Sequence, residues 1–269
     1  MKGAIYSDWP QCKKIEFKTD LKVPTLVNEQ DSLVVRVKLC CLTGGDLYRD
    51  PLLPPPSNRS PGFSIFGEVV SVGSNVDNFK LLDEIAAILP FNEGGGLLQY
   101  VVVDSKLAVL RPKTIQPQAL CASLFSSLEA YSALHYAYKL TRGDVVLIIG
   151  GGSALGKACI DLADIWGANM VIATASSREE AEFLSKETKA KVLCLYKEEE
   201  RNKLLERILE ESGGLGVDCV IEAREGDLPS FMPGEEYERE KMAKNIIFRS
   251  LGVHGRYVTK SVLQVSISF

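Results

Sequence analysis

Three consecutive glycines at 150–152 stand where an apolar run, Val145 to Ile149, gives way to a helical pattern that begins at Ser153. Glycine permits a tight turn and leaves no Cβ between the backbone and an approaching ligand. The first N–H groups of the helix that follows have no intrahelical partner, and the helix dipole adds partial positive charge there. A turn of this kind is therefore suited to binding a phosphate group through backbone donors.

The flanks of this turn indicate which phosphate ligand it would take. The helical pattern ends near Trp166, Gly167 follows, and a second apolar run covers Met170 to Ala173. Strand, glycine turn, helix and strand in this order form the unit that holds the pyrophosphate of a dinucleotide. The alternative is a structural glycine turn in another kind of α/β protein. The residues predicted to contact the pyrophosphate are Gly151, Gly152, Ser153, Ala154, Leu155 and Gly156.

The end of the second strand bears on the choice of cofactor. A site for NAD carries Asp or Glu there, which bonds to the ribose hydroxyls. Here Ser176, Ser177 and Arg178 follow the strand, and no carboxylate closes it. The serines can donate hydrogen bonds and the arginine can pair with a 2′-phosphate, so we expect NADPH to bind more tightly than NADH. The alternative is an ordinary helix-capping turn.

The remaining sequence predicts an α/β chain of two domains, residues 1–119 and 120–269. Short strands with glycine and proline between them, such as Val34–Leu39 and Gly67–Gly73, favour a β-barrel-like first domain. Strands and helices alternate in the second domain, which is typical of a parallel sheet in a Rossmann domain. Its later elements are expected at Glu179–Lys186, Val192–Leu195, Arg201–Glu211, Val217–Ile221 and Gly255–Val258.

Composition argues against several functional classes. The 269 residues carry a formal net charge of −4 without a basic run, so no nucleic-acid partner is expected. No apolar stretch is long enough to span a membrane, and the first residues do not resemble a signal peptide, so we expect a cytoplasmic protein. Two histidines and seven cysteines without a CxxC pair give no metal site. Cys159, Cys194 and Cys219 lie in apolar runs and are predicted to be buried thiols.

The order of these segments resembles the medium-chain dehydrogenase/reductase superfamily. The pieces PGFSIFGEVVSVGSNVDNF, LLDEIAAILPF, GGGSALG and LGVHGRYVT look like its zinc-free quinone oxidoreductase branch, and the resemblance runs from Met1 to about Gln264. It implies a GroES-like β-barrel domain followed by a Rossmann domain with a doubly wound parallel sheet. It also implies NADPH as the cofactor and a small-molecule acceptor, a quinone or an enone, to which hydride is transferred.

Positions that match the superfamily's zinc motifs are Thr43-Gly44-Gly45-Asp46 and Gly62-Phe63-Ser64. Two of the zinc ligands are therefore replaced, and the resemblance implies a zinc-free chain. Asp46 and Tyr48 are the polar residues that remain in the first of these loops, and they are our candidates for a catalytic role. A turn aspartate and a packed tyrosine are the alternatives.

The resemblance also carries three points about the cofactor. Tyr196 matches a tyrosine that packs near the 2′-phosphate in the family. Ser153 replaces the second glycine of the usual turn, and its hydroxymethyl group is expected to crowd the pyrophosphate. Glu129 replaces a threonine near the nicotinamide carboxamide.

These departures leave a second function open, a catalytically weak or inactive NADP(H)-binding or interaction protein. In the family the chain continues past the strand that ends at Thr259 with a further strand and helix. We therefore expect a truncated isoform or fragment with an incomplete Rossmann domain and little reductase activity. A homo-oligomer is an open alternative to a monomer.

Overall fold

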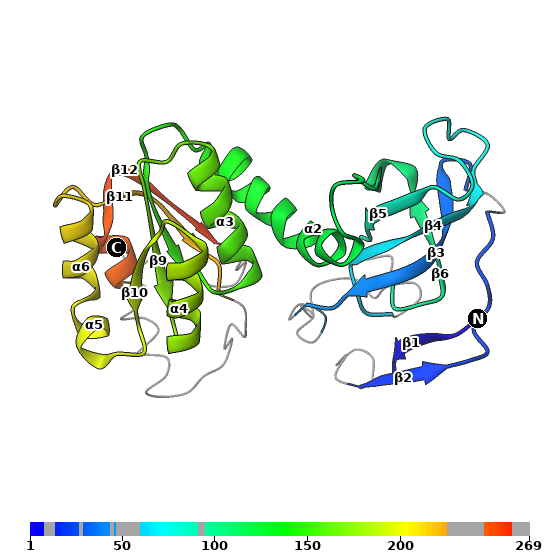
Figure 1. The fold of residues 1–269 in the computed structure, drawn as a ribbon, viewed down its shortest axis with the longest axis horizontal. Helices are drawn as coiled ribbons and strands as arrows, with labels where there is room; N and C mark the ends of the chain where they lie inside the picture. The colour runs from blue at the N-terminus through cyan, green and yellow to red at the C-terminus, as the bar shows by residue number, and fades with distance from the viewer. Residues whose placement is uncertain are drawn as a thin grey trace. The chain divides into compact units, whose positions relative to one another are not determined.

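The computed structural model describes residues 1–7, 14–26, 29–43, 46, 60–90, 95–224 and 245–259. The chain divides into two compact units, Met1–Phe125 and Ser126–Phe269 (Figure 1). The division lies inside helix α2 (Pro117–Tyr131), whereas the sequence analysis placed it near the start of the same segment.

The first unit contains a five-stranded antiparallel sheet in the order β6-β3-β4-β5-β7. Its strands are β3 (Ser32–Cys41), β4 (Ser64–Val72), β5 (Glu84–Ile88), β6 (Tyr100–Asp104) and β7 (Ala108–Leu110), with the 3-10 helix η1 (Ser105–Leu107) before β7. A separate antiparallel pair is formed by β1 (Gly3–Tyr6) and β2 (Ile15–Lys18). The predicted strands are present, but in the part of the chain that the structure describes they form an open sheet rather than a closed barrel.

Alternation along these strands builds two apolar layers. One face of the sheet carries the main core of the unit, which includes Leu33, Val35, Ile65 and Ile85. On the other face, the buried residues Phe66, Ala86, Leu120 and Cys121 bring the first turns of α2 against β4 and β5.

The second unit is a parallel five-stranded sheet in the order β10-β9-β8-β11-β12. Its strands are β8 (Val145–Ile149), β9 (Met170–Ala175), β10 (Lys191–Cys194), β11 (Val217–Glu222) and β12 (Leu251–Thr259). Its helices are the π-helix η2 (Ser132–Tyr138), α3 (Ala154–Ile165), α4 (Arg178–Glu187), α5 (Glu198–Asn202) and α6 (Leu204–Glu211). The strand order reverses at β8, and in such sheets ligands bind at the carboxyl ends of the strands beside the reversal.

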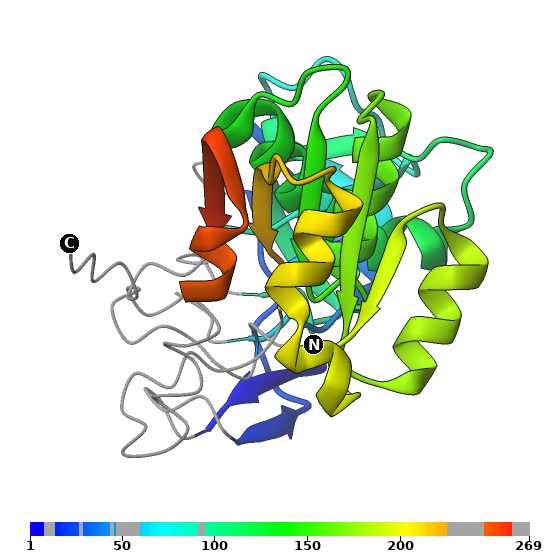
Figure 2. The ribbon, with the colours of Figure 1, turned by 90° about the vertical axis from the view of Figure 1, so that its left-hand side faces the viewer.

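Helices pack on both faces of this sheet, as a doubly wound fold requires (Figure 2). Leu155 and Cys159 of α3 and Leu184 of α4 belong to the core on one face. Leu204 and Ile208 of α6, with Ile247 of the short helix 245–249, belong to the core on the other face. The α/β prediction with a Rossmann unit is therefore confirmed.

One predicted helix, Arg201–Glu211, is two helices in the structure. α5 ends at Asn202 and α6 begins at Leu204, while α5 buries no residue. Tertiary packing explains the break, because the apolar residues that contact the sheet start only at Leu204. Residues 225–244, between β11 and the short helix 245–249, lie outside the described residues.

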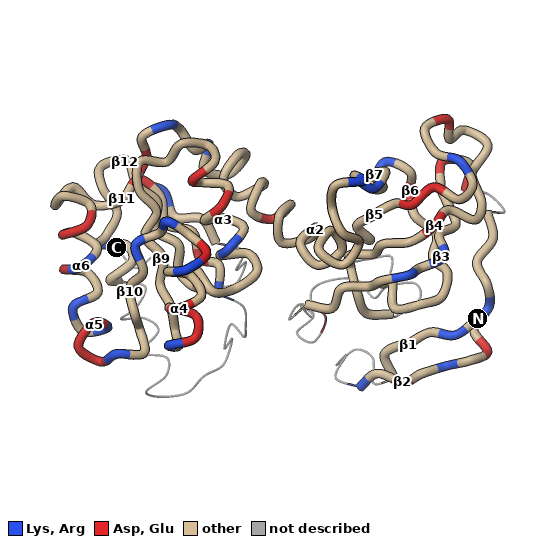
Figure 3. The backbone as a smooth tube through the Cα atoms, viewed as in Figure 1, with Lys and Arg blue, Asp and Glu red and all other residues tan. Residues whose placement is uncertain are grey.

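Charged residues of both signs are interspersed on both units (Figure 3). In the first unit, Glu68 pairs with Arg36 and Lys38, and Glu84 pairs with Lys38 and Arg111. Of the helices that the structure describes, none combines the length and the hydropathy needed to cross a bilayer.

Candidate dinucleotide-binding site

The glycine turn follows β8 directly and is anchored to β9. Gly150 has a φ of +80°, a backbone conformation that suits glycine. Its N–H donates to Oγ1 of Thr174 at 2.9 Å, and the N–H of Gly151 donates to the Thr174 carbonyl at 2.9 Å. Thr174 is buried and fixes the turn, a role that the sequence analysis missed because the two segments are more than twenty residues apart.

Two glycines of the turn have no room for a side chain. A Cβ at Gly151 would lie 2.9 Å from the Cβ of Ala173, and a Cβ at Gly156 would lie 2.2 Å from the carbonyl oxygen of Gly150. The first turn of α3 therefore packs directly on the glycine turn, which is the arrangement that brings helix N–H groups to a phosphate.

Ser153 is the N-cap of α3. Its Oγ accepts from the N–H of Gly156 at 2.9 Å, and the hydroxyl donates to the carbonyl of Ala223 at 2.6 Å. The hydroxyl thus joins α3 to the end of β11. It also occupies one of the helix N–H groups that a phosphate would otherwise use. Of the neighbouring predicted contacts, Ala154 is exposed, whereas the Leu155 side chain is part of the core and leaves only its backbone to the site.

A carboxylate lies at the end of β9 after all, contrary to the premise of the sequence analysis. Oε2 of Glu180 accepts from the N–H of Ser176 at 2.7 Å and from its hydroxyl at 2.8 Å. A Cβ at Gly152 would lie 2.6 Å from Cγ of Glu180, so this side chain runs across the glycine turn. The sequence contained the signal in the Ser177-x-x-Glu180 pattern of a capping box. Ser177 is the N-cap of α4 and accepts from the N–H of Glu180 at 3.2 Å.

The other two residues predicted to bind a 2′-phosphate are exposed. Nε of Arg178 donates to Oε1 of Glu182 at 2.8 Å, one helical turn away. This pair, with the Tyr196 phenol nearby, raises the pKa of Arg178. Tyr196 follows β10 and is about two-fifths exposed. Arg178 and Tyr196 thus lie near each other beyond β9 and β10, and their contact with a 2′-phosphate stays a prediction.

Arg224 lies against the glycine turn from the β11 side. A Cβ at Gly150 would lie 2.8 Å from Cγ of Arg224. Nε of Arg224 donates to Oε1 of Glu222 at 2.7 Å, and the hydroxyl of Tyr257 donates to the same carboxylate. Burial, and then the bond to Glu222, raise the pKa of Tyr257. The sequence analysis missed this group because its members come from the ends of two strands.

Asp46, a catalytic candidate from the sequence, is buried in the first unit. Its Oδ2 accepts from the N–H of Thr43 at 2.7 Å, and its Oδ1 accepts from the N–H of Gly62 at 2.6 Å. These bonds join two loops and favour the structural role that the sequence analysis left open. Tyr48, the other candidate, lies outside the described residues.

The positions that match zinc motifs also serve packing and backbone bonding. Phe63 is buried, with its ring centroid 6.2 Å from that of Phe125. Within the described segments, no three His, Cys, Asp or Glu side chains gather in a way that could hold a metal ion.

We expect purified protein to contain far less than one zinc per chain, because Thr43 and Phe63 supply no thiolate or imidazole. Elemental analysis measures this directly, and a chelator should leave the melting temperature unchanged. One zinc per chain, or a lower melting temperature after chelation, would contradict the zinc-free assignment.

The cysteine predictions hold for two of three residues. Cys159 and Cys219 are fully buried, whereas Cys194 is only partly buried. Burial, with the carboxylate of Glu129 nearby, raises the pKa of the Cys159 thiol to about 12. Glu129 therefore lies near Cys159 of α3, and its place beside a nicotinamide carboxamide stays a prediction.

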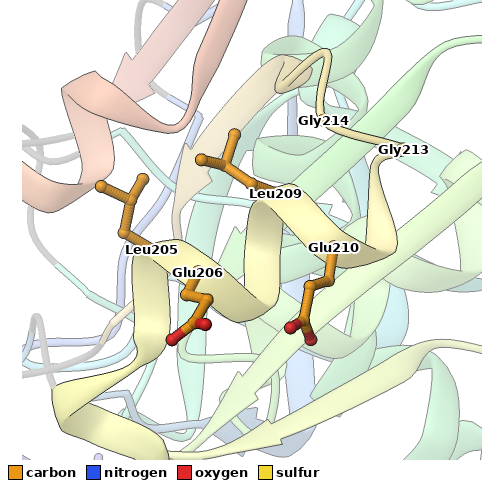
Figure 4. Close-up of a pocket in the computed structure, with 6 residues that line it drawn as sticks. All are labelled: Leu205, Glu206, Leu209, Glu210, Gly213 and Gly214. Carbon is orange, nitrogen blue, oxygen red and sulfur yellow. The ribbon is translucent and has the colours of Figure 1, made fainter.

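A shallow hollow lies on α6 and is lined by Leu205, Glu206, Leu209, Glu210, Gly213 and Gly214. Figure 4 shows the two leucines on one side of the helix and the two glutamates on the other. Its lining comes from one helix and the turn after it, and it includes no residue of the glycine turn. It is therefore separate from the candidate site.

No protein-family model matches the chain. Quinone oxidoreductase-like protein 1 of Mus musculus is 30% identical over 266 residues, which are 96% of this chain and 74% of that protein. The chloroplastic NADPH-dependent alkenal/one oxidoreductase of Arabidopsis thaliana is 30% identical over 190 residues, which are 66% of this chain and 48% of that protein. The crystal structure of a quinone oxidoreductase from Pseudomonas syringae has a TM-score of 0.75 and 22% identity, and the match covers 96% of this chain and 72% of that one.

Proposed function

Because the chain belongs to the quinone oxidoreductase-like proteins of the medium-chain dehydrogenase/reductase superfamily, we propose that it binds a nicotinamide dinucleotide and reduces a small acceptor. The observation that carries this proposal is the glycine turn between β8 and α3. Its glycines leave no room for side chains, and it stands at the carboxyl end of the strand where the sheet order reverses. A pyrophosphate can therefore approach the backbone of this turn closely.

In this proposal the backbone binds and orients the cofactor. The N–H groups of Gly152, Ala154 and Leu155 stand at the N-terminus of α3, where helix geometry supplies no intrahelical acceptor. Arg224 lies against the same turn, with its guanidinium paired with Glu222. When bound, a dihydronicotinamide supplies the hydride.

The acceptor is proposed from the relatives. One is named as a quinone oxidoreductase-like protein and another as an alkenal/one oxidoreductase. Quinones, alkenals and alkenones are all electron-poor carbonyl compounds with a conjugated double bond. We propose a quinone or an enone as the substrate class. Asp46 is not proposed as the acid that completes the reduction, because its carboxylate already accepts from two backbone N–H groups.

The observations that bear on the choice between NADPH and NADH point in both directions. The name of the Arabidopsis relative supports NADPH, as do the two serines, Arg178 and Tyr196. Two hydrogen bonds oppose a preference for NADPH: Ser176 donates to Glu180, and Arg178 donates to Glu182. These two bonds also favour the second candidate function, a weakly active nucleotide-binding protein. The N–H of Gly156, which donates to Ser153 and not to a phosphate, favours it too.

The proposal predicts that the purified chain oxidises NADH or NADPH when a simple benzoquinone or an α,β-unsaturated ketone is added. The rate should saturate with nucleotide, because binding on the turn precedes transfer. The decrease of nicotinamide absorbance measures it, with heat-denatured protein as the background. Saturable nucleotide binding without turnover of either acceptor would favour the second candidate function instead.

A further inference from the structure

Glu180 is placed to act on the part of a cofactor that distinguishes NADPH from NADH. Its carboxylate holds both donors of Ser176, the first residue after β9, at 2.7 and 2.8 Å. In dinucleotide-binding sheets, the end of the second strand contacts the ribose 2′ position, and a carboxylate there bonds to a 2′-hydroxyl. The side chain also passes over Gly152, so it lies between that position and the glycine turn.

The cations near Glu180 do not neutralise its negative charge. Arg178 is paired with Glu182, and Glu179 lies in the same first turn of α4. Lys197, beyond Tyr196, is paired with Glu200 at 2.8 Å. A 2′-phosphate brought to Ser176 would therefore approach Arg178, which is already paired, and three glutamates of α4. These are Glu179, Glu180 and Glu182.

We infer that Glu180 determines nucleotide choice and sets it against the 2′-phosphate, so that the chain binds NADH at least as tightly as NADPH. This inference rests on the proposed function, and it reverses the preference expected from the sequence. The Glu180 carboxylate accepts a hydrogen bond from the 2′-hydroxyl of NADH, whereas the 2′-phosphate of NADPH competes with it for the donors of Ser176.

The test compares the dissociation constants of NADH and NADPH for the wild-type chain, Glu180→Gln and Glu180→Lys. Glutamine keeps the length of the side chain and removes its charge, and lysine supplies a cation. We expect the affinity for NADPH relative to NADH to rise by about ten-fold in Glu180→Gln and further in Glu180→Lys. Glu187→Gln, at the far end of α4, removes the same charge and should leave the ratio unchanged.

Adenosine 2′,5′-bisphosphate and 5′-AMP isolate the adenosine end, since they differ only in the 2′-phosphate. Their affinity ratio should follow the same order across the variants. An unchanged ratio in both Glu180 variants, or a wild-type chain that binds NADPH more tightly than NADH, would overturn the inference while the proposed function stands. If no variant binds any of these nucleotides, the proposed function itself fails, and the inference fails with it.

Discussion

Replacing Gly156 with valine is expected to abolish detectable dinucleotide binding and to destabilise the second unit. The new Cβ would lie 2.2 Å from the carbonyl oxygen of Gly150 and 2.8 Å from the Cα of Gly151. Both neighbours are backbone atoms, so no side-chain rotation relieves the clash, and α3 must move away from the turn. We expect a loss of about 3 kcal/mol in the free energy of unfolding and at least about a 100-fold loss of nucleotide affinity.

Chemical denaturation and a nucleotide titration measure the two effects. Asp161→Val is the matched control, because it places the same β-branched residue on an exposed position of α3. It breaks only the exposed ion pair with Lys157, so a change of about 1 kcal/mol or less is expected. Normal nucleotide affinity in Gly156→Val would mean that the helix does not need to approach the turn.

Replacing Asp46 with alanine should lower the stability of the first unit by about 2–4 kcal/mol, because the backbone N–H groups of Thr43 and Gly62 lose their acceptor. Asp46→Asn should also destabilise, since its amide can accept only through one atom. Denaturant midpoints measure the loss.

Asp83→Ala provides the comparison for this prediction. Asp83 also accepts from a backbone N–H three residues earlier, that of Lys80 at 2.9 Å, but this bond is exposed to solvent. Its loss should cost about 1 kcal/mol or less. If Asp46→Asn instead kept full stability while turnover fell, Asp46 would have the catalytic role that the sequence suggested.

The sequence was sufficient for the unit of β8, α3 and β9 because its determinants are local. An apolar run, glycines and a 3.6-residue pattern follow one another, and each restricts the backbone without help from distant residues. The break between α5 and α6 was not predictable in the same way. The helical pattern continues through Lys203, and only the contact of Leu204 with the sheet decides where α6 begins.

Side-chain partners were harder to predict than the backbone. The serines after β9 were expected to donate to a 2′-phosphate, which stays a prediction. In the structure Ser176 donates to Glu180, whose side chain reaches back from α4. The expectation that Ser153 crowds the pyrophosphate stays a prediction, and the bond of its hydroxyl to Ala223, seventy residues later, was not foreseen. Asp46 was noted for its chemistry, and its partner Gly62 lies in another loop. Such pairings depend on the folded arrangement of distant segments.

The central claim is that the turn from Gly150 to Gly156 binds the pyrophosphate of a nicotinamide dinucleotide. Backbone amide chemical shifts of the isotope-labelled chain, recorded during a titration with NADH, test it most directly. The account predicts saturable shifts that are largest for Gly152, Ala154 and Leu155, with a further change at Ser176. An absence of shifts at these amides with saturating NADH, or shifts confined to α6 around Leu205 and Leu209, would contradict it.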